Sequence, residues 1–270
     1  MKTNFLIPLL IVVLLLATVL LFIFCNKEHA LLSDSDSYTE KEEMDLDSIT
    51  YQCGKKNLPI YHVAQQPGKI AISFDAAWGA EDFDQIMSIL EKHKVHTTYF
   101  VTGDWVENFP EKIKILVEKG HDIGNHTLNH LDCTKLSKEK LESEIKSVAD
   151  SVYELTGYEM NLFRAPYGAY NNAVIEQVYS LGYYPVQWDV DSLDWKDYGV
   201  AKIISTVCNH KALTDGSIIL LHNGSTYTYQ ALDELLTKLE GKGYTIVPVS
   251  ELIHKNNYIM DVTGSQIPIE

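Results

Sequence analysis

The stretch Ile70-Ala71-Ile72-Ser73-Phe74-Asp75-Ala76-Ala77-Trp78-Gly79 indicates the fold class of this chain. Its first five residues are apolar or small, and they end at an aspartate, as a buried strand does. Behind this run, Phe83, Ile86, Met87 and Leu90 recur at helical spacing. A strand followed by a helix is the repeating unit of proteins built on a mainly parallel sheet.

The same alternation of strand and helix continues along the chain. After the strand at residues 70–74, further strands are expected at residues 97–101, 121–124, 161–163, 184–188, 217–221 and 244–247. Between them one helix begins at Pro110 and ends at Gly120, and a longer one runs from about Ser137 to Gly157. Seven units of this kind predict an α/β fold, a deformed (β/α) barrel with about seven parallel strands. Functional side chains of such barrels gather where the strands end.

The first part of the chain differs in composition from the rest. Residues 5–24 carry no charge, and at about 1.5 Å per residue a helix of this length crosses the roughly 30 Å hydrocarbon layer. We expect residues 1–27 to be an uncleaved membrane anchor rather than a signal peptide, because the segment ends in bulky residues instead of small ones. Lipidation of Cys25 is the minor alternative, since Phe24 before it is not small.

Three further regions follow the anchor. Residues 28–56 are expected to be a flexible acidic linker, because seven acids and one lysine between Asp34 and Asp47 leave little apolar surface to bury. Residues 57–255 form the predicted catalytic domain, and residues 256–270 a C-terminal tail. The formal net charge of −15 argues against nucleic acid as a partner, because phosphates are bound by basic patches. Four cysteines without a CxxC pair predict neither a zinc ribbon nor a disulfide scaffold.

Polar residues occur where five of the expected strands end. Asp75 follows the first strand; alone, such an aspartate is more often a helix cap or a turn residue than a catalyst. His126 and His130 follow the third strand and are four residues apart, so one helical turn would bring both imidazoles to a single metal ion. An isolated pair with this spacing is as often an ordinary exposed turn.

The other three positions lie further along the chain. Arg164 stands in Phe163-Arg164-Ala165-Pro166-Tyr167-Gly168, where a guanidinium can keep a carboxylate ionised or form a structural salt bridge. The stretch from Trp188 to Trp195 holds three acids and two tryptophans in eight residues, and His222 ends an apolar strand. The ordinary explanation of the first is a turn with buried aromatic residues. The ordinary explanation of His222 is a core histidine whose hydrogen bonds are made within the protein. Convergence of all five positions at one barrel mouth favours an active site instead.

Taken in this order, the five motifs resemble those of the polysaccharide deacetylase family, whose NodB-type homology domain is also called carbohydrate esterase family four. The resemblance covers roughly residues 57–255. It implies the NodB-like deacetylase fold, a divalent metal ion, usually zinc, and hydrolysis of an acetamide on a sugar. The roles it implies are His126 and His130 as metal ligands, Asp75 as catalytic base, His222 as general acid, Arg164 as the residue that tunes the base, Asp191 as the partner of His222, and Leu220 and Trp195 as walls of the acetyl pocket.

The chemistry of acetamide hydrolysis explains these residue types. A bound cation polarises the carbonyl and lowers the pKa of its water from about 15.7 toward about 7, so that the carboxylate of Asp75 can take the proton. The leaving amine needs a proton, which His222 can donate near neutral pH if Asp191 keeps it cationic. Charge on the carbonyl oxygen needs donors, for which the metal and a backbone N–H near Tyr167 are candidates.

One position departs from the family pattern. Most members carry a second aspartate after the base as a metal ligand, whereas this chain has Ala76. Three consequences are open: two histidines and waters hold the ion weakly, Asp75 turns to the metal and another group is the base, or activity is lost. A Gram-positive subset of the family looks like this chain, with Asp-Ala-Ala-Trp at this point, which favours a variant design over damage.

The sequence therefore predicts a metal-dependent hydrolase that removes N-acetyl groups from a cell-wall polysaccharide, with peptidoglycan as the expected substrate. We expect a monomer held in the cell membrane by a single span, with its catalytic domain outside the cell, or a secreted form if the first segment is cleaved. One alternative is a glycan-binding module on the same fold that has lost productive metal binding. Another is a deacetylase of chitooligosaccharides or of a non-carbohydrate amide.

Overall fold

The computed structural model describes residues 57–269 of the 270-residue chain. The predicted anchor at residues 1–27 and the predicted linker at residues 28–56 both precede this part, so both expectations lie outside the described residues. Between residues 57 and 269, no helix combines the length and the apolar character that crossing a bilayer requires.

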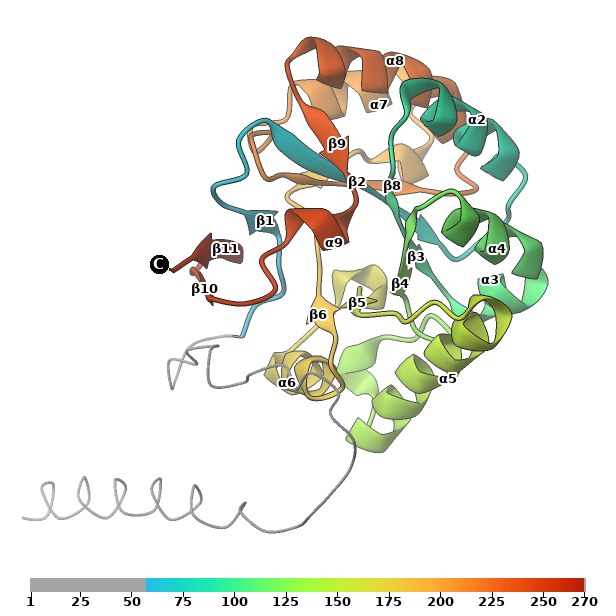
Figure 1. The fold of residues 1–270 in the computed structure, drawn as a ribbon, viewed down its shortest axis with the longest axis vertical. Helices are drawn as coiled ribbons and strands as arrows, with labels where there is room; N and C mark the ends of the chain where they lie inside the picture. Colours follow the sequence, from blue (N-terminus) through green and yellow to red (C-terminus); the bar gives the residue numbers. More distant parts are fainter. Residues whose placement is uncertain (1–56, 270) are drawn as a thin grey trace, which may run out of the picture. The chain divides into compact units, whose positions relative to one another are not determined.

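A parallel sheet lies at the centre of the described part, and helices surround it (Figure 1). Seven strands follow one path in the order β6-β5-β4-β3-β2-β8-β7, and β9 pairs with β2 beside this path. The strands are β2 (Lys69–Ala76), β3 (Thr98–Val101), β4 (Asp122–Asn125), β5 (Leu162–Phe163), β6 (Tyr184–Pro185), β7 (Val190–Asp191), β8 (Ile218–His222) and β9 (Thr245–Val247). Within residues 57–269 no ladder joins β6 to β7, so the sheet curls into an incomplete barrel.

The predicted α/β architecture and the seven predicted strands are confirmed, with strand ends that differ by up to three residues. The additional strand β7 was not predicted, because two residues inside an acid-rich stretch give no strand signal. The helices are α2 (Phe83–His93), α3 (Gly103–Asn108), α4 (Pro110–Glu118), α5 (Lys138–Thr156), α6 (Asn172–Ser180), α7 (Val200–Cys208), α8 (Thr228–Gly241) and α9 (Val249–Leu252). Short 3-10 turns are η2 (Cys133–Lys135), η3 (Pro166–Gly168) and η4 (Asp194–Lys196).

Local signals explain where the longest helix begins and ends. Before α5, the Ser137 side chain accepts a hydrogen bond from the Lys140 backbone N–H at 3.2 Å, as an N-cap does. After it, Gly157 takes the left-handed conformation with a φ of 72°, which suits a residue without a Cβ atom. Both ends of this helix agree with the sequence prediction.

The two faces of β2 belong to different parts of the core. Ile70, Ile72, Phe74 and Ala76 are fully buried in the larger apolar cluster, which packs against the surrounding helices. Asp75 lies between the last two in sequence and therefore points to the opposite face of the strand. The side chain of Ala76 thus contributes to packing and offers no ligand beside Asp75.

The last residues of the described chain are part of the domain. β10 (Tyr258–Met260) and β11 (Ser265–Pro268) form an antiparallel pair, and β11 also pairs in parallel with β1 (His62–Val63). The predicted boundary at residue 255, with residues 256–270 as a tail, is therefore wrong. Two very short strands in a mainly polar stretch give no clear period, whereas pairing with a distant strand stabilises them.

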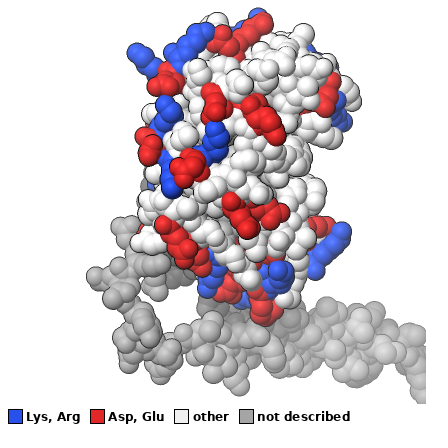
Figure 2. Space-filling view, turned by 90° about the vertical axis from the view of Figure 1, so that its right-hand side faces the viewer, with Lys and Arg blue, Asp and Glu red and all other residues white. Residues whose placement is uncertain are grey.

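Acidic and basic side chains are interspersed on the face that Figure 2 shows. Between α4 and α2, Lys112 lies 2.5 Å from Asp84 and Lys119 lies 3.1 Å from Glu91. Mixed charges of this kind do not make the continuous basic surface that binds phosphates.

Candidate active site

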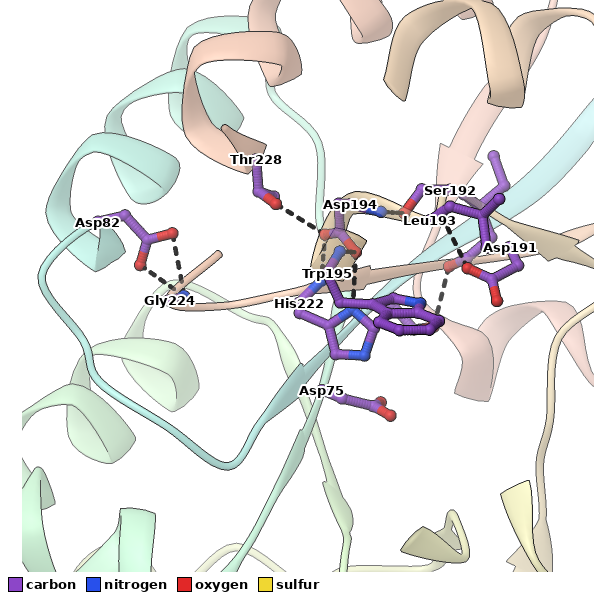
Figure 3. Close-up of polar contacts among 12 residues, drawn as sticks. Asp75, Asp82, Asp191, Ser192, Leu193, Asp194, Trp195, His222, Gly224 and Thr228 are labelled. Atoms are coloured by element: carbon purple, nitrogen blue, oxygen red, sulfur yellow. Dashed lines mark hydrogen bonds and ion pairs between the residues drawn. The ribbon is translucent and has the colours of Figure 1, made fainter. Parts of the chain in front are cut away.

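The predicted base and acid lie at the carboxyl ends of two neighbouring strands. In the parallel ladder between β2 and β8, Asp75 pairs in register with His222. Paired residues point to the same face of a sheet, so the carboxylate of Asp75 and the imidazole of His222 lie on the same side of the sheet, next to each other (Figure 3). Asp75 is 6% exposed and the His222 side chain is 13% exposed, so both groups are largely shielded from bulk water.

Arg164 is fully buried and binds Asp75 directly. Its Nη1 donates to Asp75 Oδ1 at 2.7 Å, and its Nη2 donates to the Gln187 carbonyl at 3.0 Å. The guanidinium also lies 3.9 Å from the centroid of the Phe100 ring. A planar group with several fixed donors can make these contacts together, which lysine cannot. Arg164 is the only arginine in the sequence, and it holds one oxygen of Asp75 while Oδ2 stays open.

Burial and charge act against each other on Asp75. Burial by itself raises the pKa of this carboxyl, but the positive charge of Arg164, followed by His126 and His222, lowers the pKa below its ordinary value. The group is therefore ionised at neutral pH. A carboxylate with one oxygen held and the other available is in the state that a general base requires.

His126 and His130 come together, but not by the helical turn that the sequence suggested. The segment between them is irregular, with left-handed φ values of 67° at Thr127 and 52° at His130. The centroids of the two imidazole rings are 4.9 Å apart. The expected juxtaposition of the rings is therefore present, whereas the expected helix is wrong because two left-handed residues turn the chain back on itself.

His126 is oriented by the backbone and points its free nitrogen at Asp75. Its Nδ1 lies 2.8 Å from the Arg164 carbonyl, and because a carbonyl only accepts, Nδ1 carries the hydrogen. Nε2 lies 3.5 Å from Asp75 Oδ2. Burial lowers the pKa of His126 to about 4 and also lowers the pKa of His130, so both rings are neutral at pH 7.

A buried glutamate of α5 fixes the loop that carries the two histidines. Glu144 is fully buried, and its carboxylate accepts hydrogen bonds from the Asn129 backbone N–H at 2.8 Å and from Asn129 Nδ2 at 2.7 Å. Lys140 lies 2.8 Å from the same carboxylate and balances its charge. Glu144 carries no signal in the sequence, because at its position it looks like one more polar residue of an amphipathic helix.

His222, the predicted acid, is bound by Asp194 and not by the predicted partner Asp191. His222 Nδ1 lies 2.7 Å from Asp194 Oδ1, and the His222 backbone N–H donates to Asp194 Oδ2 at 2.7 Å (Figure 3). Asp194 is fully buried, and Thr228 Oγ1 donates to its Oδ2 at 2.7 Å. The prediction for Asp191 is therefore corrected to Asp194, which fixes both the ring and the backbone of His222.

Asp191 instead closes the turn after β7. Its Oδ1 accepts the Leu193 backbone N–H at 2.8 Å. Leu193 has a left-handed φ of 57°, and the reversal there turns Asp194 inward. Asp191 influences His222 only through charge: burial by itself lowers the pKa of His222, but Asp194, and then Asp75 and Asp191, raise it above its ordinary value.

The three predicted substrate-binding residues lie at different places around the site. Leu220 pairs with Ser73 two residues before His222, so it lies on the same face of the sheet, and it is 2% exposed. Trp195 follows Asp194 and is 48% exposed, as a side chain at the rim of a site would be. Tyr167 is 72% exposed, with its ring centroid 4.7 Å from that of His130.

Two further residues near His222 were not singled out by sequence analysis. The Trp78 ring stacks on the His222 ring, with centroids 5.4 Å apart and an interplanar angle of 24°. Asp82 accepts the Gly224 backbone N–H with both carboxylate oxygens, at 3.0 and 3.1 Å, and so ties the loop after β2 to the loop after β8 (Figure 3). An unusual density of aromatic and acidic residues within eight positions of Asp75 was the available signal.

His126, His130 and Asp75 together offer the kinds of ligand that a metal ion binds, but they are few. Two neutral imidazoles and one carboxylate oxygen are ligands that zinc prefers. Nevertheless, no group of three or more His, Cys, Asp or Glu side chains in residues 57–269 has the geometry to hold a metal ion as it stands. The two histidines therefore form the most defined part of this donor set.

Comparison with known proteins agrees with this arrangement. The family model described as polysaccharide deacetylase matches residues 62–186. The peptidoglycan-N-acetylmuramic acid deacetylase PdaA of Bacillus subtilis is 35% identical to this chain over 187 residues, which cover 68% of this chain and 71% of PdaA. This chain belongs to the polysaccharide deacetylase family. The predicted NodB-type fold and the predicted polysaccharide N-deacetylase class are thereby confirmed.

Two other members of the family illustrate its range. The peptidoglycan-N-acetylglucosamine deacetylase PgdA of Listeria monocytogenes is 36% identical over 184 residues, which cover 68% of this chain and 38% of PgdA. The crystal structure of BA3943 from Bacillus anthracis, described as a pseudoenzyme of carbohydrate esterase family four, superposes with a TM-score of 0.69 at 27% identity and covers 73% of this chain and 69% of that one. The fold of the family thus occurs with and without activity.

Proposed function

We propose that this polysaccharide deacetylase is metal-dependent and hydrolyses the acetamide of N-acetylated sugars in peptidoglycan. The observation that carries the proposal is the pairing of Asp75 with His222 across two parallel strands. Surrounding charges lower the pKa of the carboxyl and raise the pKa of the imidazole, which favours an ionised base and a protonated acid in one site. All the groups involved come from one chain, which supports action as a monomer.

The residues beside Asp75 suit a divalent cation, with zinc as the proposed ion. His126 Nε2 has its lone pair free because Nδ1 is bound to a carbonyl, and His130 lies against it. With Ala76 in the core cluster, His126 and His130 are the side chains that would hold the ion, and Asp75 Oδ2, 3.5 Å from His126 Nε2, would remain beside it as the base. When bound there, the cation would polarise the acetyl carbonyl and acidify water.

Asp75 is the proposed general base. Arg164 holds Oδ1 and keeps the group ionised, so Oδ2 takes a proton from the attacking water. The water oxygen then bonds to the acetyl carbon. The backbone N–H of Tyr167, in the exposed turn beside His130, is the proposed donor to the carbonyl oxygen, where negative charge develops.

His222 is the proposed general acid. Asp194 binds Nδ1, so Nε2 is the nitrogen that faces the substrate. The raised pKa favours the protonated ring, and Nε2 gives its proton to the sugar nitrogen as the carbon–nitrogen bond breaks. Acetic acid, which ionises to acetate, and a free amine are the products; Asp75 returns its proton to solvent and His222 takes one up, so both groups are restored.

Peptidoglycan is the proposed substrate because PdaA and PgdA are both named for it. PdaA is named for N-acetylmuramic acid and PgdA for N-acetylglucosamine, so either sugar is a candidate here. A substrate in the cell wall agrees with an anchor at residues 1–27 and a catalytic domain outside the membrane. Unlike a binding module, this chain retains a base, an acid and a partner for each, which supports activity.

The test is release of acetate and of free amines from purified peptidoglycan by the full-length chain. We expect His130→Ala to abolish most of this release and to reduce the zinc that the protein retains. His96→Ala is the matched control, because His96 is exposed and precedes β3 at the end of the sheet away from the site. Mass spectrometry of the products identifies the sugar that has lost its acetyl group.

Equal acetate release by the unchanged chain and by His130→Ala would reject the proposal. Retention of glycan binding without acetate release or bound metal would favour the binding module instead. Activity restricted to chitooligosaccharides would keep the mechanism and replace the substrate.

A further inference from the structure

An exposed tryptophan stacks on the ring of His222, the proposed acid. The stretch that begins at Asp75 reaches Trp78 three residues later, and 52% of the surface of Trp78 is exposed. Its ring stacks on the ring of His222 at a centroid distance of 5.4 Å. An indole that is half exposed beside the proposed acid keeps part of its apolar face free to contact a ligand.

The main chain that carries Trp78 is held in place by the neighbouring loop. The Gly79 carbonyl accepts hydrogen bonds from Asn223 Nδ2 at 2.7 Å and from Trp105 Nε1 at 3.4 Å. Three residues further on, the Asp82 carboxylate accepts the Gly224 backbone N–H. The indole is therefore pre-positioned, which reduces the entropy that ligand binding would cost.

Gly224 allows the two loops to approach this closely. Its φ is +86°, a conformation that side chains with a Cβ atom rarely adopt. A Cβ atom at this position would lie 3.2 Å from the Gly79 carbonyl oxygen and 3.6 Å from the Cβ atom of Trp78. The backbone of one loop thus packs against the residue that carries the indole, and His222 is two residues away in the same loop.

The indole of Trp78 lies next to the place where the reacting sugar is expected. If His222 donates a proton to the sugar nitrogen, that sugar lies within hydrogen-bond reach of the imidazole. Trp78 covers the ring of the same imidazole, so the exposed part of the indole lies within reach of a sugar joined to the reacting one. Aromatic faces offer large apolar area at little cost in side-chain entropy, which suits the C–H surfaces of a pyranose ring.

We propose that Trp78 is a specificity-determining residue that contacts the sugar next to the one being deacetylated. The proposal rests on the proposed function, since it places the reacting sugar at His222. It makes the enzyme prefer glycan chains over single sugars, because a monosaccharide has no neighbouring ring to reach the indole.

The experiment compares Trp78→Ala with the unchanged full-length chain on N-acetylglucosamine and on its tetramer. We expect KM for the tetramer to rise about tenfold, with kcat for both substrates and kcat/KM for the monosaccharide nearly unchanged. Trp78→Phe should recover most of the tetramer affinity. Tyr153→Ala is the matched control, because Tyr153 is an aromatic residue with 56% exposure on α5.

An equal loss of kcat on both substrates in Trp78→Ala would show that the indole merely positions His222, and would overturn the proposal. Unchanged KM for the tetramer would overturn it as well. Calorimetric binding of the tetramer in the His130→Ala background separates this proposal from the proposed function, since it needs no turnover. Weaker tetramer binding on adding Trp78→Ala supports the contact even if deacetylation is absent, and equal binding contradicts it.

Discussion

One carboxylate of Asp194 holds both the ring and the main chain of His222. Oδ1 lies 2.7 Å from the imidazole Nδ1, and Oδ2 accepts the backbone N–H at 2.7 Å. Because the carboxylate is fully buried and receives a third bond from Thr228, its orientation is fixed. Nδ1 therefore carries a hydrogen, and Nε2 is the nitrogen that can serve a substrate.

Asp194→Asn is expected to lower kcat for deacetylation by about 100-fold or more, because an amide does not stabilise the protonated imidazole. The pKa of His222 should fall with it, so the alkaline limb of the pH–rate profile moves to lower pH. Asp191→Asn is the matched control and should change kcat far less, since Asp191 bonds only to the turn at Leu193. A larger loss in Asp191→Asn than in Asp194→Asn would contradict this assignment.

The choice between these two aspartates shows where sequence reasoning ends. A run with three acids in six positions, from Asp189 to Asp194, predicts that a carboxylate reaches the site. Which one does so depends on the left-handed turn at Leu193, and leucine gives no sign of that conformation. The carboxylate of Asp189 accepts hydrogen bonds from the Ile218 backbone N–H at 2.9 Å and from the Ser217 hydroxyl at 3.0 Å, so it does not reach the site.

The strands and the order of the motifs were predictable because each depends on a local pattern. Apolar runs such as residues 70–74 identify the strands, and parallel strands place their carboxyl ends at one edge of the sheet. Contacts between distant segments were not predictable in the same way. Glu144 beneath the histidine loop and the pairing of β11 with β1 depend on tertiary packing, which leaves no period in the sequence.

Glu144 should support metal binding without touching the ion. Glu144→Ala leaves the Asn129 backbone N–H and side-chain amide without their buried acceptor, so the loop between His126 and His130 loosens. Changes of this kind behind metal ligands typically cost about 10- to 100-fold in affinity, and we expect zinc affinity to fall in this range. Competition with a zinc-binding dye measures it.

Glu142→Ala is the matched control for this test. Glu142 is on the same helix but pairs with Lys146 at the surface, where an ion pair contributes little. The zinc affinity of Glu142→Ala should equal that of the unchanged chain. If both variants bind zinc equally well, Glu144 does not order the loop.

Arg164 should be needed for stability as well as for the base. Arg164→Met leaves the charge of Asp75 buried without its partner, and we expect the free energy of unfolding to fall by about 3–5 kcal/mol. Arg164→Lys should recover only part of this, because an ammonium cannot reproduce the planar contacts to Asp75 and the Gln187 carbonyl. Urea unfolding measures both. Adding Asp75→Asn to Arg164→Met should restore stability, and a further loss in the double variant would contradict the charge argument.

Asp82 should make the folded chain less stable as the pH rises, whereas acids in salt bridges usually make it more stable. Burial raises its pKa from 3.8 to about 6, because the backbone N–H groups of Gly224 and of Asp82 itself compensate its charge only in part. Between about pH 4 and pH 6 the folded chain therefore holds a proton here that the unfolded chain has released. The contribution of Asp82 to stability is most favourable at low pH and is lost as the pH rises toward 6.

Asp82→Asn removes this titration and keeps an oxygen that can accept the Gly224 N–H. Relative to the unchanged chain, its free energy of unfolding should rise with pH from 4 to 6 and then level off, gaining about 1–3 kcal/mol. Urea unfolding of both chains at pH 4.5 and pH 7.5 gives the difference. Glu81→Gln controls for loss of one negative charge, since Glu81 is the exposed neighbour. A stability difference between Asp82→Asn and the unchanged chain that is the same at both pH values would show that the Asp82 carboxylate is ionised throughout, and that the bond to Gly224 outweighs its burial.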